Sequence, residues 1–376
     1  MIQNKFFPEI HGNFGFGCMR LPMKDGHVNY DEFCKMADAF IASGLNYFDT
    51  AHGYISGQSE TAIRDCVAKR YDRSQFLLTD KLTDPFFKKQ EDIRPFFMQQ
   101  LAWCGVDYFD FYLMHAQDRN NYQKYKRCRA YETCHALKEE GLIRHFGISF
   151  HDKAEVLDMI LTEHPEIEIV QIQFNYVDYE DASVESKKVY EVCEKHGKPV
   201  IVMEPVKGGS LVNLPADADK ILRDLNGGSN ASYALRFAAS FPNMAMVLSG
   251  MSDMAQMTDN LSAMADFVPL NETEMAAVKK VNDIFHGLNL IPCTSCRYCV
   301  EENECPKHIL IPDIFSAMNA HEAFQDWNSG MYYGIVTRGG HGKASDCIKC
   351  GKCEKVCPQH LPIRELLEKV SKTFEG

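Results

Sequence analysis

The sequence lacks an apolar segment long enough to cross a bilayer. Its longest stretch without a charged residue, Phe237 to Ser252, has 16 residues and contains Pro242, Asn243 and Gly250. A membrane-spanning helix needs about 20 apolar residues. The N-terminal segment has neither the apolar centre nor the cleavage signal of a secretory peptide. We therefore expect a cytoplasmic protein that does not insert into membranes.

Positive charge is also in short supply. The chain has 40 Lys and Arg residues against 52 Asp and Glu residues, a formal net charge of −12, and no run of basic residues. Because nucleic acids and anionic membranes are bound through clustered cations, neither is an expected partner. The pattern G-x-x-x-x-G-K-[ST] is absent as well, so a phosphate-binding P-loop is not indicated.

Short apolar runs alternate with longer amphipathic stretches over residues 1–285. Eight of these runs show no strict alternation of apolar and polar residues, which is typical of strands buried on both faces of a parallel sheet. They are Gly15–Met19, Leu45–Asp49, Phe76–Lys81, Phe109–Met114, Arg144–Ser149, Ile169–Gln173, Pro199–Met203 and Met244–Ser249. Eight units of strand then helix predict a (β/α)8 TIM barrel over residues 1–285. An open, doubly wound α/β sheet is the alternative that the pattern also allows.

Two of the expected helices can be placed by their ends. Asn29 and Glu32 have the spacing of a capping box, so a helix should begin there and run to Ser43. A second helix is expected over Lys124–Glu140, because Gly141 directly follows it and glycine commonly ends helices.

The character of the chain changes after residue 285. Of its 15 cysteines, eight lie between Cys293 and Cys357, and in a reducing compartment such a concentration indicates metal binding rather than disulfides. We expect residues 286–376 to form a small second domain. It should contain helices over Pro312–Phe324 and Pro362–Phe374, with a long glycine-rich loop over Gln325–Lys343 between them.

The eight late cysteines form two similar motifs. The second motif follows the spacing C-x2-C-x2-C-x3-C-P, and the first differs only in a last gap of five residues. In two-cluster ferredoxins the fourth cysteine of each motif binds the cluster of the other motif. The spacing thus predicts two [4Fe–4S] clusters with crossed ligands. One set is Cys293, Cys296, Cys299 and Cys357, and the other is Cys347, Cys350, Cys353 and Cys305.

Two structural zinc sites are the alternative for these cysteines. Zinc is normally bound by paired C-x2-C units, not by a triple unit followed by Cys-Pro, so the iron–sulfur interpretation is favoured. With a helix expected after each motif, residues 287–376 resemble the helical two-cluster ferredoxin domain.

Four polar residues near the expected barrel strands have types that suit carbonyl reduction. Asp49 ends the second strand, Tyr54 follows it by five residues, Lys81 ends the third strand and His115 follows the fourth. Barrel active sites are built at these carboxyl-terminal strand ends. Hydride transfer to a ketone leaves an alkoxide that needs a proton. A tyrosine tuned by a lysine and an aspartate can supply that proton, while a histidine polarises the carbonyl.

These four residues, in this order, resemble the aldo-keto reductases over about residues 12–270. The segments that carry the resemblance are Gly15–Pro22, Phe48–Tyr54 with Ser59-Glu60, Asp110–His115, Gly147–Ser149 and Gly250 to Asn260. The resemblance implies that Tyr54 is the proton donor, that Lys81 and Asp49 tune it, and that His115 orients the carbonyl.

The resemblance also implies a nicotinamide nucleotide as cofactor. Ser149 and Gln171 would hold its carboxamide, and the segment from Gly250 to Asn260, including Gln256 and Asp259, would hold its adenosine end. Members that prefer NADP often carry arginine at the position of Gln256, and a 2′-phosphate is best bound by Arg or Lys. NADH is therefore slightly favoured over NADPH.

The two halves together predict an oxidoreductase that reduces a small carbonyl compound with NAD(P)H. The clusters would link it to a one-electron carrier protein. Because a nicotinamide gives up two electrons together and a cluster accepts one at a time, a flavin is a further candidate cofactor. Two alternatives remain: an electron-transfer or docking subunit of a larger redox complex, and a flavin-dependent reductase of a C=C bond.

Overall fold

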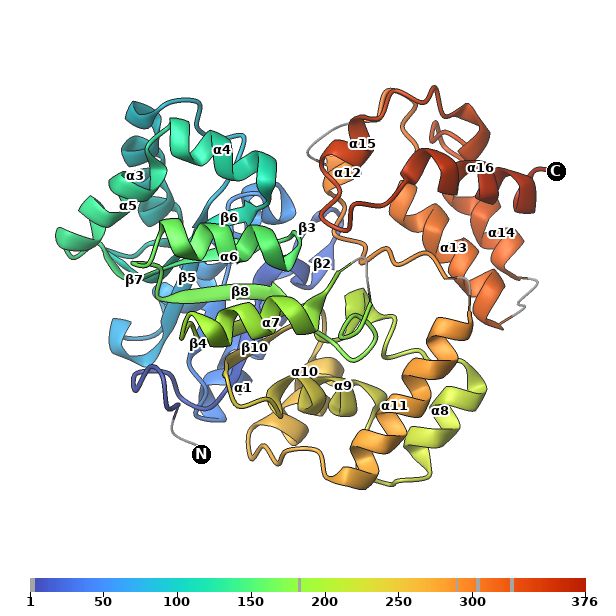
Figure 1. The fold of residues 1–376 in the computed structure, drawn as a ribbon, viewed down its shortest axis with the longest axis horizontal. Coiled ribbons are helices and arrows are strands. Elements are labelled where there is room, and N and C mark those ends of the chain that lie inside the picture. Colours follow the sequence, from blue (N-terminus) through green and yellow to red (C-terminus); the bar gives the residue numbers. More distant parts are fainter. Residues whose placement is uncertain (1–3, 182–183, 289, 302–304, 325–327) are drawn as a thin grey trace. The chain divides into compact units, whose positions relative to one another are not determined.

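The computed structural model describes residues 4–181, 184–288, 290–301, 305–324 and 328–376 (Figure 1). The chain divides into two compact units. The first consists of Met1–Pro205 and Ala231–Asn271, and the second of Val206–Asn230 and Glu272–Gly376. In the described part of the chain, no helix combines the length and the apolarity that crossing a bilayer demands.

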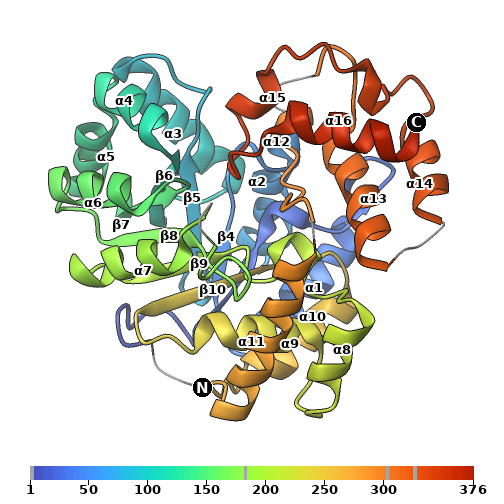
Figure 2. The same cartoon turned by 45° about the vertical axis from the view of Figure 1, so that its right-hand side comes forward.

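A closed barrel of eight parallel strands forms the centre of the first unit (Figures 1 and 2). The strands are β1 (Phe14–Gly17), β4 (Tyr47–Asp49), β5 (Leu77–Leu82), β6 (Phe109–Gln117), β7 (Ile143–Phe150), β8 (Ile169–Gln173), β9 (Val200–Met203) and β10 (Met244–Gly250). Each strand pairs with the barrel strands before and after it in the chain, and β10 closes the ring on β1. The predicted TIM barrel is confirmed, and the open-sheet alternative is wrong.

Helices of the first unit follow the barrel strands in the chain. They are α1 (Tyr30–Ala42), α2 (Gln58–Ile63), α3 (Gln90–Cys104), α4 (Arg119–Arg127), α5 (Ala130–Glu139), α6 (Ala154–Glu163), α7 (Ser186–Lys195), α9 (Asn230–Ala239) and α10 (Met254–Met264). A two-stranded hairpin, β2 (Met23–Lys24) and β3 (His27–Val28), precedes α1. The predicted start of α1 is confirmed, because the Asn29 side chain caps it by accepting the backbone N–H of Glu32.

The single helix predicted over Lys124–Glu140 is wrong. The chain bends between α4 and α5 at Arg129, whose φ of 51° is left-handed. The bend lets both short helices bury an aromatic ring, Tyr125 in α4 and Tyr131 in α5. This packing outweighs the local preference for one continuous helix.

The barrel interior is filled by an apolar layer. Phe7 and Ile10, from the segment before β1, pack against inward-facing residues of the strands, among them Tyr47, Leu77, Leu113, Ile169, Ile201 and Met246. Since alternate residues of a strand share a face, residues two positions further along the same strands also point inward. These next positions lie at the carboxyl-terminal ends of the strands, where the predicted site residues are.

The second unit contains α8 (Ala216–Arg223) and α11 (Glu272–Gly287), which pack together, and five further helices. The five are α12 (Tyr298–Glu301), α13 (Ile311–Phe324), α14 (Asn328–Val336), α15 (Lys352–Lys355) and α16 (Ile363–Phe374). The helices predicted over 312–324 and 362–374 are confirmed as α13 and α16. The core of this part is small and contains two of the late cysteines, Cys299 and Cys353.

The long loop predicted over Gln325–Lys343 is wrong. Residues 325–327 lie outside the described part, but α14 occupies residues 328–336. Tyr333 of this helix is buried, stacks on Phe374 with ring centroids 4.8 Å apart, and donates a hydrogen bond to Glu375. These contacts outweigh the roughly 1 kcal/mol that each of Gly330 and Gly334 costs inside a helix.

Candidate active site

Inward-facing polar residues follow the apolar layer of the barrel toward the carboxyl-terminal ends of the strands. Asp49 is two residues beyond Tyr47 on β4, and Lys81 is four beyond Leu77 on β5. The same even spacing holds for His115 after Leu113 on β6 and Gln171 after Ile169 on β8. Their even spacing places these four side chains on the inner face. Neighbouring strands of the closed sheet therefore bring residues far apart in the sequence to one end of the barrel.

Lys81 is the centre of the predicted catalytic group. Its side chain is fully buried, and its Nζ donates to Asp49 Oδ1 at 2.5 Å and to the Thr50 carbonyl at 2.8 Å. A third contact joins Lys81 Nζ to the Tyr54 hydroxyl at 3.3 Å. The other carboxylate oxygen of Asp49 accepts a hydrogen bond from Gln171 Nε2 at 3.2 Å. Asp49, Lys81 and Tyr54 are thus connected by direct contacts in a site closed to solvent.

Tyr54 lies in a short turn after β4 and is only 9% exposed. Burial raises its pKa well above the usual value for a phenol, and the nearby negative charges of Asp49, Asp80 and Glu204 raise it further. A neighbouring lysine by itself would lower the pKa of a phenol, but burial and the carboxylates dominate at Tyr54. Tyr54 is therefore a neutral phenol that can donate a proton.

His115 is buried beside Tyr54, with ring centroids 6.0 Å apart. Burial, together with the positive charge of Lys81, holds its pKa well below the usual value, so the imidazole is neutral. Its Nδ1 lies 2.8 Å from the Thr83 hydroxyl, and that hydroxyl is 3.3 Å from the Lys81 carbonyl oxygen. The sequence analysis did not identify Thr83. Its position two residues after Lys81, directly after β5, could have indicated that its side chain lies on the same side as that of Lys81.

The two residues expected at the nicotinamide carboxamide have different surroundings. Ser149, at the end of β7, is 1% exposed, and its Oγ has no hydrogen-bond partner among the described residues. Gln171, which pairs in register with Ser149 from the middle of β8, is bonded to Asp49 instead of being free. A buried hydroxyl without a partner is uncommon and marks a place where a polar ligand group fits.

The residues expected at the adenosine end lie after β10. Gly250 ends that strand, and Asn260 Nδ2 of α10 donates to Ser249 Oγ at 2.8 Å. Gln256 is held by Asp253, the residue that caps α10, through a side-chain contact of 3.0 Å. Asp259 lies on the same helix. The segment therefore presents a carboxylate and an amide at the start of α10, and no cation from the segment itself.

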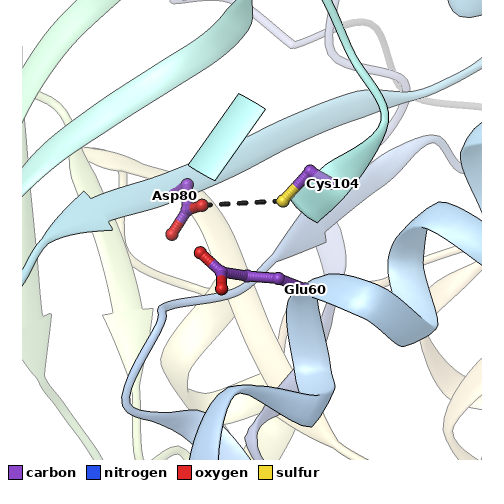
Figure 3. A group of neighbouring side chains, drawn as sticks. All are labelled: Glu60, Asp80 and Cys104. Carbon is purple, nitrogen blue, oxygen red and sulfur yellow. Dashed lines mark hydrogen bonds between the residues drawn. The ribbon is translucent and has the colours of Figure 1, made fainter. Parts of the chain in front are cut away.

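A second buried polar group, which the sequence did not predict, lies on the opposite face of β5. Asp80 points away from the barrel interior toward Glu60 of α2 and Cys104 of α3 (Figure 3). Cys104 Sγ donates to Asp80 Oδ2 at 3.6 Å, and His52 Nδ1 contacts Glu60 Oε2 at 2.6 Å. Burial raises the pKa of Glu60 to about 7, and burial together with the charge of Glu60 raises that of Asp80. Burial therefore favours the protonated form of both carboxyl groups.

The late cysteines gather around two cavities in the second unit. One cavity is lined by four of them, Cys293, Cys296, Cys299 and Cys357. The other is lined by Cys305, Cys347, Cys350 and Cys353. Each cavity thus combines three cysteines of one motif with the last cysteine of the other. Four thiolates around one cavity match the donor set that a [4Fe–4S] cluster requires.

The cysteines before residue 290 are separate from these cavities. Cys18 and Cys104 are buried, and burial raises the pKa of both thiols, so they are unreactive at neutral pH. Cys34 and Cys66 form a disulfide, a pairing that the sequence did not predict.

Comparisons with known proteins agree with the barrel and with the cysteine motifs. Residues 13–283 match the model of the Aldo/keto reductase family, and residues 292–361 match that of the 4Fe-4S dicluster domain. The barrel and the cluster motifs define an iron–sulfur oxidoreductase. Because the first match covers most of the chain, the protein belongs to the aldo/keto reductase family, as an enzyme with an added 4Fe-4S dicluster domain.

Individual relatives are distant and cover mainly the barrel. An uncharacterized oxidoreductase of Bacillus subtilis, YqkF, is 24% identical in an alignment of 297 residues that covers 70% of this chain and 90% of the relative. The NADH-specific methylglyoxal reductase of Escherichia coli is 26% identical in an alignment of 207 residues that covers 50% of this chain and 59% of that protein.

Solved structures support the fold. An aldo-keto reductase of Bacillus halodurans in its holo form has a TM-score of 0.59 at 23% identity, covering 72% of this chain and 91% of its own. An aldo-keto reductase of Klebsiella pneumoniae in complex with NADPH has a TM-score of 0.59 at 19% identity, covering 72% and 90%.

Proposed function

We propose that this enzyme reduces a small carbonyl compound with NAD(P)H and that its two [4Fe–4S] clusters exchange single electrons with a carrier protein. The observation that carries the first half is the buried chain of contacts from Asp49 through Lys81 to Tyr54, with neutral His115 beside it. The methylglyoxal reductase among the relatives supports a carbonyl substrate.

The nucleotide, when bound, supplies a hydride, and the residues of the site do the rest. Reduction consumes the carbonyl compound, NAD(P)H and one proton, and yields the alcohol and NAD(P)⁺. Tyr54, protonated because of its raised pKa, gives its phenolic proton to the oxygen that becomes negative. Lys81, held by Asp49 and the Thr50 carbonyl, fixes the phenol and balances the phenolate that remains.

His115 would polarise the carbonyl through its Nε2–H. A neutral imidazole has one N–H, so this role requires Nδ1 to be the acceptor. The Thr83 hydroxyl is closer to Nδ1, at 2.8 Å, than to the Lys81 carbonyl oxygen, at 3.3 Å. We therefore propose that Thr83 donates to Nδ1 and is a positioning residue that selects the useful tautomer of His115.

Ser149 is proposed to hold the nicotinamide carboxamide, because its buried hydroxyl lacks a partner among the described residues. Gln171 would contribute from β8. The adenosine end of the nucleotide is proposed to be held by Gly250, Gln256, Asp259 and Asn260. NADH is favoured over NADPH because the start of α10 carries Asp253 and Gln256 and no cation of its own.

For the clusters we propose the two crossed ligand sets that line the two cavities. We also propose a barrel domain over 1–285 and a cluster domain over 286–376, supported by family matches that end at 283 and begin at 292. Thiolates that bind clusters need a reducing compartment, so we propose a cytoplasmic location.

The test is turnover by protein purified without oxygen, with NADH or NADPH and a panel of aldehydes and ketones. Tyr54→Phe should lower kcat by about 10²- to 10⁴-fold, the usual contribution of a general acid. The matched control, Tyr30→Phe, changes a partly exposed tyrosine on α1 and should leave kcat unchanged. Turnover by Tyr54→Phe at the native rate would refute the catalytic assignment. A flavin spectrum would redirect the proposal to flavin chemistry.

A further inference from the structure

The two cysteine-lined cavities differ in exposure and in charge. The inner cluster site is the cavity lined by Cys293, Cys296, Cys299 and Cys357. Each of these four cysteines is partly or fully buried. Around the other cavity, here called the outer cluster site, Cys350 is exposed. Ile348, two residues before it, is 57% exposed. The outer site therefore has an exposed cysteine, whereas the described cysteines of the inner site are partly or fully buried.

The charged groups at the two sites follow the same division. The inner site is lined by one cation, Arg297, which is bound to Asp313 at 2.9 Å and to Glu301 at 3.0 Å. Among the described residues, the outer site is lined by three cations, Lys307, Lys352 and Arg364, and by no carboxylate. Of these, Arg364 is paired with Glu354.

Two further exposed lysines lie close in the chain to residues that line the outer site. Lys349, paired with Glu368, lies between Ile348 and Cys350, and Lys355, for which the described residues provide no ion pair, follows Cys353 by two residues. An exposed apolar residue surrounded by cations has the layout of a protein docking surface, with an apolar centre and a charged rim. In a chain of net charge −12, such a local excess of cations is unusual.

We propose that an acidic one-electron carrier protein docks on this edge, defined by Ile348, Lys349, Cys350, Lys352 and Lys355, and exchanges electrons through the outer cluster. The inference rests on the proposed function, since it needs the clusters to be present and redox-active. Opposite charges would speed the encounter, and the negative remainder of the chain would disfavour docking elsewhere.

Each encounter transfers one electron between carrier and outer cluster, with no proton moved and no bond broken. The carrier is oxidised when the cluster is reduced, and the reverse holds when electrons leave. Ile311 lines both cavities, so the two cluster sites adjoin at this side chain. The inner cluster therefore connects to the carrier through the outer cluster.

The test uses the full chain with both clusters, reduced with dithionite and freed of excess reductant. It is mixed in a stopped-flow instrument with an oxidised acidic [2Fe–2S] ferredoxin or with a small uncharged quinone, which needs no docking. For the wild type we expect fast reduction of the ferredoxin that slows as salt is added. Lys349→Glu combined with Lys355→Glu should slow it at least tenfold and flatten the salt dependence, while the quinone rate stays unchanged.

Two further variants complete the design. Lys279→Glu combined with Lys280→Glu, at two exposed positions of α11, makes the same charge change away from the edge and should leave both rates unchanged. Ile348→Ser changes no charge and should slow the ferredoxin reaction alone. Native ferredoxin rates in the Lys349/Lys355 and Ile348 variants, or equal losses in the Lys279/Lys280 control, overturn the docking inference. If the wild type reduces neither acceptor, the proposed function itself fails.

Discussion

The barrel and the cluster region solve the problem of stability in different ways. In the barrel, an apolar layer of strand residues fills the interior, and the polar site residues lie above it. In the cluster region, the core includes Cys299 and Cys353 themselves, with other late cysteines packed against it. The polar site residues of the barrel lie outside its apolar core, whereas the cysteines proposed to bind the clusters are part of the core of their own region. Losing a site residue should therefore lower activity without unfolding the barrel, whereas losing a cysteine should unfold the cluster region.

The largest effect is expected from removing one cluster ligand. Cys353→Ala should abolish the outer cluster and unfold much of the cluster region, because a metal-bound core that loses its metal loses its folding free energy. Iron should fall from about eight per chain to about four or fewer. The barrel should remain folded and keep the NAD(P)H-dependent carbonyl reduction that we propose for it.

The measurements are iron and sulfide content, limited proteolysis and carbonyl reduction on the same sample. Cys193→Ala is the matched control, since it removes a buried thiol from α7 of the barrel. It should keep all the iron. If Cys353→Ala also abolishes turnover, the two regions are not independent in the way that their cores suggest.

A smaller effect is expected on the pH dependence of the free energy of unfolding of the barrel, because of the buried carboxyl group of Glu60. The folded-state pKa of Glu60 is raised to about 7, so the folded protein keeps a proton that the unfolded chain has released above about pH 4.3. This group's contribution to stability is complete below that pH and is lost as the pH rises through 7. Glu60→Gln, which cannot ionise, should be more stable than the wild type at pH 8, by about 3 to 4 kcal/mol.

Urea unfolding from pH 5 to pH 8, followed by circular dichroism, measures this difference. Glu140→Gln, at an exposed carboxylate paired with Arg94, is the control and should leave the pH profile nearly unchanged. An identical profile for Glu60→Gln and the wild type would contradict the raised pKa of Glu60.

The two regions also differ in how much of them the sequence could predict. The cysteine motifs are local, so their spacing alone predicted the two ligand sets that line the cavities, and the eight apolar runs predicted the strands. Asp49, Lys81 and His115 could be found because strand ends in a barrel converge. Contacts between elements that are distant in the chain could not be predicted from the sequence. The break at Arg129 and the helix around Tyr333 depend on such packing, as does the pair of Glu60 and Asp80.

Thr83 belongs to this unpredicted class and gives the smallest and most specific effect. Thr83→Val keeps the shape of the side chain and removes the hydroxyl that faces His115 Nδ1. Without that donor the two neutral tautomers of His115 come closer in free energy, and the molecules with a bare Nε2 cannot donate to the carbonyl. We expect kcat to fall about tenfold, equal to about 1.4 kcal/mol, with KM for the nucleotide and the cluster spectra unchanged.

Thr83→Ser keeps the hydroxyl and should restore most of kcat, which a loss of packing alone would not explain. The nitrogen chemical shifts of His115 in labelled protein report the tautomer directly. They should indicate a proton on Nε2 in the wild type and in Thr83→Ser, and a mixture in Thr83→Val. If the wild type carries the proton on Nδ1, then His115 donates to Thr83 rather than to substrate, and the carbonyl must be polarised by Tyr54 alone.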